Sequence, residues 1–467
     1  MASISPKSGY VGSLTESEGQ KLRAFWRILM QSWNANTATP EEAAEKVKSN
    51  DSAKGHRRFF SLGRALEPKL SEEETSAIPS NLLTTLNSLD AGPAELKTIQ
   101  SLMLKLPGDK LRSALLTLLK QDHPDALLLR FLRAVKWNLP KAWIKLVAAL
   151  NWRVNEYKVD EEVLLKGEAH AVDKSQQDGD SPEKKYGEGF ILQATSGKGH
   201  FHGCDRWNRP IGIVRVRKHD PSAQTQKALN DYIVQCIETV RLLQVPPVET
   251  MAIVFDLTSF ALGNWELAAI SFILHAFQEY YPESLGAMIF YNAPLIFAGL
   301  WRLVQGSLDP VVAAKVHFIS SAKALEEIIP REQILKELGG EEDWEYEYIE
   351  PAPNENAKLN DIATRDDILA KREKLGDELF TLTAEWIVDS KTKSLPRRNE
   401  VIEELRRNYW DLDPYVRART VLDRTGVIKG DGTVDFYPAA KPKNEPTEKQ
   451  LIVPEVGTTT QTPVAAS

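Results

Sequence analysis

Cysteine is scarce in this chain, and the two that occur, Cys204 and Cys236, stand in no metal-ligand spacing. Two cysteines in 467 residues suit a reducing compartment better than a fold held together by disulfides. Basic charge is not in excess either, because 58 Lys and Arg face 65 Asp and Glu, for a formal net charge of −7. Broad nucleic-acid binding needs a basic face, so this balance argues against it.

Long apolar runs and leader segments are also missing. No uninterrupted apolar stretch approaches the roughly 18 residues of a membrane span. The N-terminal MASISPKSGYVGSLTESEGQK has no apolar core and contains Glu16 and Glu18, unlike a secretory signal or a transit peptide. We therefore expect a soluble, cytoplasmic protein whose contact with membranes is peripheral and reversible.

The usual catalytic signatures are absent. The chain has no Gly-x-Ser-x-Gly elbow, phosphate loop or dinucleotide fingerprint, and Gly197-Lys198-Gly199 lacks the surroundings of a nucleotide loop. His200 and His202 alternate as strand residues would, but no third metal ligand is apparent, so they are expected to be solvated loop histidines. Because no nucleophile and base can be named, we expect neither an enzyme nor a cofactor or metal site.

Helical periodicity dominates the first third of the chain. Leu22, Phe25, Trp26 and Leu29 repeat at helical spacing, which predicts a helix over 13–33. The same pattern returns at 93–104, 109–120, 125–135 and 140–157, and together these segments predict a helical domain over 10–157. Residues 34–90 are poor in apolar side chains and rich in Lys, Glu, Ser and Pro, which is typical of a flexible insertion.

Strands alternate with helices from about residue 190. Strands are predicted at 211–216, 250–257, 287–291 and 315–320, with helices at 222–243, 265–280, 295–308 and 323–329. This alternation predicts an α/β domain over 186–350 with a mainly parallel sheet. A C-terminal helical extension is expected over 355–437 and a disordered tail over 438–467. The extension has one apolar face, formed by Ile368, Leu375, Leu379, Leu382 and Trp386.

The segment 295–308 is unusually apolar, with Arg302 as its one charged residue. Periodicity alone allows a core helix buried on both sides, but a mobile lid over a lipid cavity is the alternative. Each buried acyl methylene contributes about 0.8 kcal/mol, so lipid chains need a long apolar enclosure with a door. Asn292-Ala293-Pro294 and Gly306 flank the helix as candidate hinges. The residues expected to form this gate are Leu295, Phe297, Leu300, Trp301 and Val304.

Several ordered blocks resemble those of the CRAL-TRIO lipid-binding proteins, above all the fungal phosphatidylinositol transfer proteins. The segment 127–138, with Trp143 and Trp152-Arg153, is similar to the helices that precede the lipid domain in that family. The resemblance covers roughly 10–33 and 93–350, and it implies a lipid domain with a mobile gate helix. The blocks within the domain are DRWNRP (205–210), YYPESLG (280–286), NAP (292–294), LDPVVAAK (308–315) and the segment 329–340.

The resemblance implies that Lys136, Asp205, Glu283 and Lys315 hold an inositol phosphate headgroup. Lysines offer point charges to a phosphate, and carboxylates accept hydrogen bonds from ring hydroxyls. Taken alone, Glu283 and Lys315 read as surface charges, and only the joint match favours a site. Two positions depart from the family pattern, because Val135 replaces an arginine and Val312 a threonine.

The family's choline site is lost more completely. Its two tyrosines, serine and threonine correspond to Phe201, Gly212, Met251 and Ile253, so all four hydroxyls are absent. An apolar wall cannot pair a buried phosphate, and an unpaired charge is expensive to bury. We expect a carrier of phosphatidylinositol with reduced or no phosphatidylcholine binding. Its second ligand is expected to be an apolar lipid such as a sterol or a neutral isoprenoid, and its transient partner a membrane surface.

A rival hypothesis comes from a different class of protein. In it, the α/β domain holds a fixed lipid and acts as a regulatory scaffold, while the C-terminal helices recruit a protein partner. A deletion separates the two hypotheses. If the protein is a pure carrier, removing 355–467 should leave lipid transfer intact.

Overall fold

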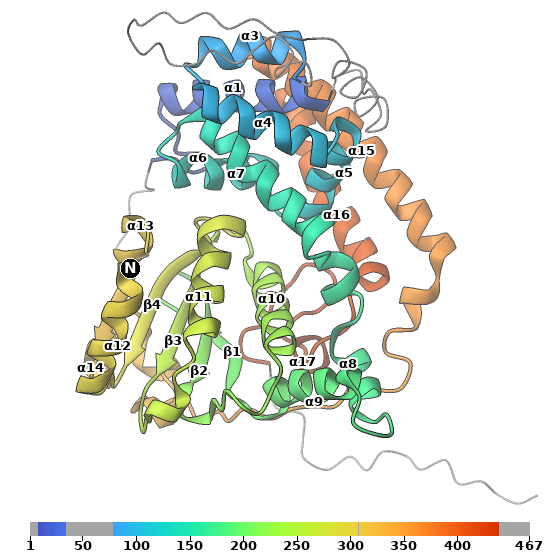
Figure 1. The fold of residues 1–467 in the computed structure, drawn as a ribbon. Coiled ribbons are helices and arrows are strands. Elements are labelled where there is room, and N and C mark those ends of the chain that lie inside the picture. Colours follow the sequence, from blue (N-terminus) through green and yellow to red (C-terminus); the bar gives the residue numbers. More distant parts are fainter. Residues whose placement is uncertain (1–7, 34–77, 307, 439–467) are drawn as a thin grey trace, which may run out of the picture.

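The protein is described here by a computed structural model, which covers residues 8–33, 78–306 and 308–438. A layer of helices forms the top of the molecule in Figure 1. The five helices expected there are confirmed. The flexible insertion was expected over 34–90, and its part up to residue 77 lies outside the described residues. The remainder, 78–90, contains a further helix, α3. The helices of this layer are α1 (Glu16–Trp33), α3 (Ser80–Ser88), α4 (Pro93–Lys105), α5 (Gly108–Leu119), α6 (Pro124–Ala134) and α7 (Leu139–Asn151).

Two short π-helical turns, Trp152–Glu156 and Val159–Leu164, lead from this layer to α8 (Gly167–Ser175) and α9 (Pro182–Thr195). The sequence pattern predicted no helix between 157 and 190. A start signal for α9 is nevertheless present, since Pro182 occupies the first turn and the Ser181 hydroxyl accepts a hydrogen bond from the Lys184 N–H at 3.1 Å.

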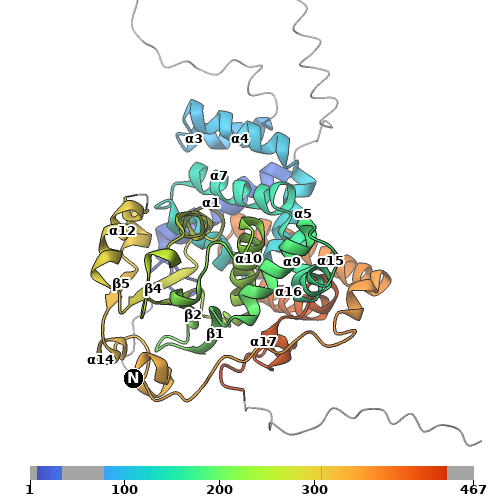
Figure 2. The same ribbon diagram turned by 60° about the horizontal axis from the view of Figure 1, so that its bottom comes forward.

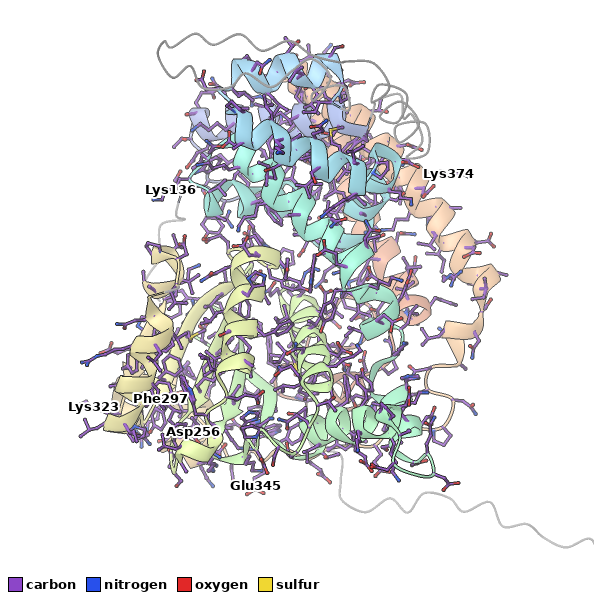
Figure 3. All side chains as sticks on the ribbon, in the orientation of Figure 1. Lys136, Asp256, Phe297, Lys323, Glu345 and Lys374 are labelled. Atoms are coloured by element: carbon purple, nitrogen blue, oxygen red, sulfur yellow. The ribbon has the colours of Figure 1, made fainter. Side chains whose placement is uncertain are left out.

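A five-stranded sheet forms the second part of the molecule. Its strands lie in sequential order, with β1 antiparallel to β2 and the remaining pairs parallel, which confirms the mainly parallel sheet. Figure 3 shows Asp256, at the carboxyl end of β3, at the foot of the molecule, and Lys136 above the opposite end of the sheet. The strands are β1 (Gly199–Cys204), β2 (Pro210–Arg215), β3 (Met251–Asp256), β4 (Leu285–Tyr291) and β5 (Val316–Ile319).

The crossover helices all lie on one face of this sheet (Figures 1 and 2), as expected when sequential parallel strands are joined by crossovers of one hand. They are α10 (Gln226–Leu243), α11 (Leu267–His275), α12 (Leu295–Gln305) and the short α13 (Pro310–Ala313). Alternate strand residues point to opposite faces, so Met251 and Ile253 face these helices while Ala252 and Val254 face the other way. The second face is covered by α14 (Ala322–Leu325) and the segment that follows it.

The two histidines of β1 correct one expectation. His200 and His202 are buried, with exposed fractions of 6% and 8%, and the His202 ring stacks on Trp344 with centroids 4.0 Å apart. They are strand residues covered by aromatic rings and are not solvated loop residues. Burial lowers the pKa of His200 to about 3.

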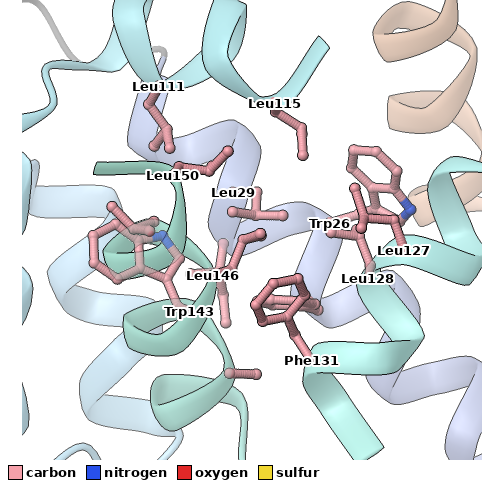
Figure 4. Packing of buried hydrophobic residues seen from close by; sticks show 14 of the residues in the cluster. Trp26, Leu29, Leu111, Leu115, Leu127, Leu128, Phe131, Trp143, Leu146 and Leu150 are labelled. Atoms are coloured by element: carbon pink, nitrogen blue, oxygen red, sulfur yellow. The ribbon is translucent and has the colours of Figure 1, made fainter. Parts of the chain in front are cut away.

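The C-terminal extension packs against the rest of the protein. It consists of α15 (Ile362–Val388), α16 (Leu395–Val416) and α17 (Val421–Arg424). Leu375 and Leu379, on the predicted apolar face, are buried in the core of the helical layer. Figure 4 shows the centre of that core, where Trp26, Phe131 and Trp143 meet. The end of the extension reaches the α/β domain, where Leu422 and Ile428 join its core.

Candidate functional site

A cavity of about 210 Å³ lies between the sheet and three of its crossover helices. Its floor comes from β1 to β4 and its roof from α10, α11 and α12. Almost all of the wall is carbon, because alternate residues of the strands and the inner faces of the helices are apolar. Five of the eight cavity and gate residues predicted from the sequence line it, namely Phe201, Met251, Ile253, Phe297 and Trp301.

The four positions that lost their hydroxyls come together on the cavity floor. Phe201 pairs with Gly212 across β1 and β2, and Gly212 pairs with Ile253 across β2 and β3. A Cβ on Gly212 would lie 3.1 Å from Phe201 Cε1 and 3.3 Å from Met251 Cε. The aromatic ring and the thioether therefore fill the space above this glycine, and the floor here has no hydrogen-bonding side chain from these positions.

The helix α12 closes one end of the cavity and is buried on one side only. Phe297, Trp301 and Val304 face inward with exposed fractions of 3%, 7% and 3%. Leu295 and Leu303 face outward and are 95% and 70% exposed. The core-helix alternative, with burial on both sides, is therefore wrong.

The gate residues predicted from the sequence thus divide between two faces of α12. The inward Phe297 and Trp301 line the cavity, and Trp301 contacts Phe290 of β4 with ring centroids 4.8 Å apart. Val304 is buried without lining the cavity, and Leu300 is half-buried between the two faces. Leu295 belongs to the outer face, so α12 is apolar toward both the cavity and the solvent.

Glu283 and Lys315, two of the four predicted headgroup residues, are brought together. Both precede strands at the amino end of the sheet, and Lys315 Nζ lies 3.4 Å from Glu283 Oε2. The side chains are 14% and 20% exposed, so the pair is reachable from solvent. Lys136 is exposed at the end of α6, on the helical layer that faces this edge (Figure 3).

Tyr10 and Arg133 were missed by the sequence analysis and lie in the same region. The Arg133 guanidinium lies over the Tyr10 ring, 4.0 Å from its centroid, and donates to Glu249 at 2.8 Å. Burial raises the pKa of Tyr10, and the nearby charges of Glu249 and Glu283 add to this effect. Tyr10 therefore contacts Arg133 and lies within electrostatic reach of Glu283. No short-range sequence signal marks this contact, because Tyr10 and Arg133 are far apart in the chain.

Asp205 is held inside its own turn. Its carboxylate accepts hydrogen bonds from the Trp207 and Arg209 backbone N–H groups at 2.9 and 3.0 Å and from Arg209 Nε at 2.6 Å. The side chain is fully buried. In this conformation Asp205 orients Arg209, whose Nη1 would collide with a Cβ on Gly286, at the start of β4.

A polar cluster at the cavity wall was also missed. Lys198 Nζ lies 2.9 Å from His219 Nδ1, and His219 Nε2 lies 2.7 Å from Glu266 Oε2. Burial lowers the pKa of Lys198 to about 8, although the charge of Glu266 opposes this effect. Burial also lowers the pKa of His219. The sequence around Lys198 suggests only a comparison with a nucleotide loop. The cluster was missed because His219 and Glu266 are distant from Lys198 in the chain.

In the part of the chain that the structure describes, no helix is long and apolar enough to cross a membrane. Among the same residues, no group of three or more Cys, His, Asp and Glu side chains is arranged to hold a metal ion.

Comparisons with known proteins agree with this architecture. Residues 194–340 match the model of the CRAL/TRIO domain, and residues 81–148 match that of the CRAL/TRIO N-terminal domain. The CRAL-TRIO domain-containing protein C3H8.02 of Schizosaccharomyces pombe is 31% identical over 90% of this chain and 92% of its own length. Phosphatidylinositol transfer protein CSR1 of Eremothecium gossypii is 31% identical over 90% of this chain and 98% of its own length.

A solved structure, the crystal structure of Sfh5, matches 48% of this chain and 73% of that chain with a TM-score of 0.35 and 18% identity. The two relatives each align with 90% of this chain and with more than nine-tenths of their own length. They show that this chain belongs to the CRAL-TRIO family of lipid-binding proteins.

Proposed function

We propose that this protein carries phosphatidylinositol between membranes. The observation that carries the proposal is an apolar cavity closed by a helix that is apolar on both faces, with the Glu283–Lys315 pair at the adjacent edge of the sheet. The acyl chains would occupy the cavity, and the inositol phosphate would sit at the amino ends of β4 and β5. CSR1 of Eremothecium gossypii, a full-length relative, is named a phosphatidylinositol transfer protein, which supports this assignment.

Charge and hydrogen bonding support the headgroup site. Lys315 and Lys136 would provide cations for the phosphate, and Glu283 would accept hydrogen bonds from ring hydroxyls once the headgroup separates it from Lys315. Asp205 would act by holding Arg209 in place. Because Val135 and Val312 supply neither charge nor hydroxyl, the phosphate would be held by fewer groups than in the family pattern.

The cavity floor argues against phosphatidylcholine as the second ligand. Phe201, Met251 and Ile253 would surround a buried phosphocholine with carbon, and a buried anion without a partner is strongly unfavourable. We propose that the second ligand is an apolar lipid. No cofactor and no chemical step are needed for such a carrier, which we propose acts from the cytoplasm.

Loading requires α12 to move. Its outer residues Leu295, Ile296 and Leu303 would enter the bilayer interface, and the helix would swing away while lipid enters. Open and closed states must then lie within a few kcal/mol of each other. The rival scaffold hypothesis is not favoured, because the apolar face of α15 that a partner would need is buried against the helical layer.

Replacing both Lys136 and Lys315 with alanine should reduce phosphatidylinositol transfer at least tenfold, since two charge-assisted contacts to the phosphate are lost. The measurement is transfer of labelled phosphatidylinositol between donor and acceptor vesicles. A matched control replaces Lys323 and Lys374, which are exposed and lie away from this edge (Figure 3), and should transfer at the wild-type rate. Wild-type transfer by the Lys136→Ala/Lys315→Ala protein, with its melting temperature unchanged, would refute the headgroup site.

A further inference from the structure

The cavity has one polar end, formed by the chain Lys198–His219–Glu266, that the phosphatidylinositol site does not use. The backbone carbonyl of Lys198 accepts a hydrogen bond from Arg215 N–H at 2.7 Å, at the carboxyl end of β2. Glu283 and Lys315 precede strands at the opposite end. A six-residue strand spans roughly 20 Å, so the two polar groups are separated by about the length of the sheet.

Lys198, at one end of this polar chain, lies across the sheet from α12. It precedes the edge strand β1, whereas α12 lies over β4 and β5 at the other edge (Figure 2). Glu266, at the other end of the polar chain, follows Trp265, whose ring contacts Phe297 with centroids 6.0 Å apart. Lys198, His219, Glu266, Phe297 and Trp301 all line the same cavity. A lipid that entered below α12 could therefore reach Lys198 with one terminus while its body stayed among apolar side chains.

Lys198 has unused hydrogen-bonding capacity. The residue is 9% exposed, and among the described residues its ammonium makes one hydrogen bond, to His219 Nδ1 at 2.9 Å. An ammonium has three hydrogens to donate, so two remain for a ligand in the cavity that Lys198 lines. Leaving such donors unpaired in an apolar enclosure is unfavourable, and a ligand oxygen would relieve this penalty.

The local charge selects a neutral oxygen. With His219 accepting from Lys198 at Nδ1, its Nε2–H donates to Glu266, so the carboxylate balances the ammonium through one uncharged ring. A second carboxylate or a phosphate would then add an uncompensated negative charge to a wall that is almost all carbon. A hydroxyl or carbonyl oxygen would accept from the ammonium without adding charge.

Resting on the proposed carrier function, we infer that the second ligand is an uncharged lipid with a single terminal oxygen function, whose oxygen accepts a hydrogen bond from Lys198. Its hydrocarbon body would lie over Met251 and Ile253 and end below Phe297 and Trp301. Lys198 is thus a specificity-determining residue for the cavity, separate from the inositol phosphate site.

The test compares three C18 ligands that differ only at one end: labelled 1-octadecanol, octadecane and octadecanoate. Each is equilibrated between vesicles and the full-length protein, and the bound fraction of each variant is divided by that of the wild type. Lys198→Met should lower octadecanol binding roughly tenfold to a hundredfold, because a hydrogen bond to a charged donor is lost. Octadecane binding should be unchanged or stronger.

Lys218→Met is the matched control, because Lys218 is an exposed neighbour that does not line the cavity. This variant should bind all three ligands as the wild type does.

Glu266→Gln supplies an independent readout: without the balancing carboxylate, octadecanoate binding should rise relative to octadecanol binding. The inference would be overturned if Lys198→Met lowered the bound fractions of octadecanol and octadecane equally, or lowered neither. Phosphatidylinositol transfer is measured in parallel, and its persistence in Lys198→Met separates this result from a failure of the headgroup site.

Discussion

Single side chains on α12 distinguish this helix from a core helix that is buried on all sides. Leu295 and Leu303 remain 95% and 70% exposed although the helix contains only one charged residue, Arg302. Composition predicted the apolar character of this helix, but it could not show which residues faced outward. The three-dimensional placement of β4 decides this, because Phe297 and Trp301 pack on Phe290 and so turn Leu295 and Leu303 toward solvent.

Replacing Leu295 and Leu303 with glutamate should weaken binding to phospholipid vesicles and slow lipid transfer several-fold. Two carboxylates would have to leave water when α12 enters the bilayer interface, whereas the closed protein already exposes both positions. Vesicle co-sedimentation and thermal unfolding measure the two effects. Val388→Glu, at an 87% exposed apolar position on α15, is the control and should bind vesicles normally. Normal membrane binding by the double variant would argue against docking through α12.

Among the elements, α16 is fixed to α6 by a buried ion pair. The Arg398 guanidinium donates to both oxygens of Asp125 at 2.8 and 2.6 Å and to Thr383 at 2.9 Å. Burial alone would raise the pKa of Asp125, but the charge and hydrogen bonds of Arg398 lower it to about 2. The folded-state pKa therefore lies below the ordinary value of 3.8, and the stabilisation is fully present above pH 3.8 and lost as the pH falls through about 2.

Arg398→Met should lower the free energy of unfolding by roughly 3–5 kcal/mol at neutral pH, because it leaves a buried carboxylate without its partner. The difference from the wild type should shrink as the pH falls from 4 toward 2. Arg397→Met is the matched control: Arg397 pairs with Glu378 and Glu404 on the surface, so its loss should barely change the melting temperature. Chemical denaturation at several pH values measures both. Equal stability of the two variants would contradict a structural role for the buried pair.

Element prediction succeeded where local signals dominated. The apolar runs of β3 and β4 and the periodicity of α1 and α6 specify these elements almost alone. The second helix of the extension, α16, carries Pro396 in its first turn, where proline is tolerated. The helices α8 and α9 were missed because they bury few apolar residues and depend on tertiary contacts.

For the molecule as a whole, the C-terminal extension joins the helical layer to the lipid domain. Arg372 of α15 donates to the backbone carbonyls of Leu116 and Lys120 in the helical layer, while Trp410 of α16 and Leu422 of α17 are buried in the core of the lipid domain. Removing 355–467 would therefore expose core residues of both parts. The expectation that such a deletion spares transfer is not supported by this packing, since loss of activity would follow from unfolding alone.

The candidate site was only partly predictable at this scale. Residues inside ordered blocks, such as Glu283 and Lys315, could be identified because the blocks fix their place at the amino ends of the strands. Asp205 was named as a headgroup ligand, but its burial within a turn could be seen only in three dimensions. Lys198, Tyr10 and Arg133 escaped detection because each acquires its role from a residue far away in the sequence.

The most direct test of the account is mass spectrometry of lipids extracted from the full-length protein after incubation with mixed cell membranes. We expect the extract to contain phosphatidylinositol together with an uncharged lipid that has a single oxygen function, and little or no phosphatidylcholine. Abundant phosphatidylcholine would contradict the argument from Phe201, Gly212, Met251 and Ile253. Extraction of no lipid at all would contradict the carrier function itself.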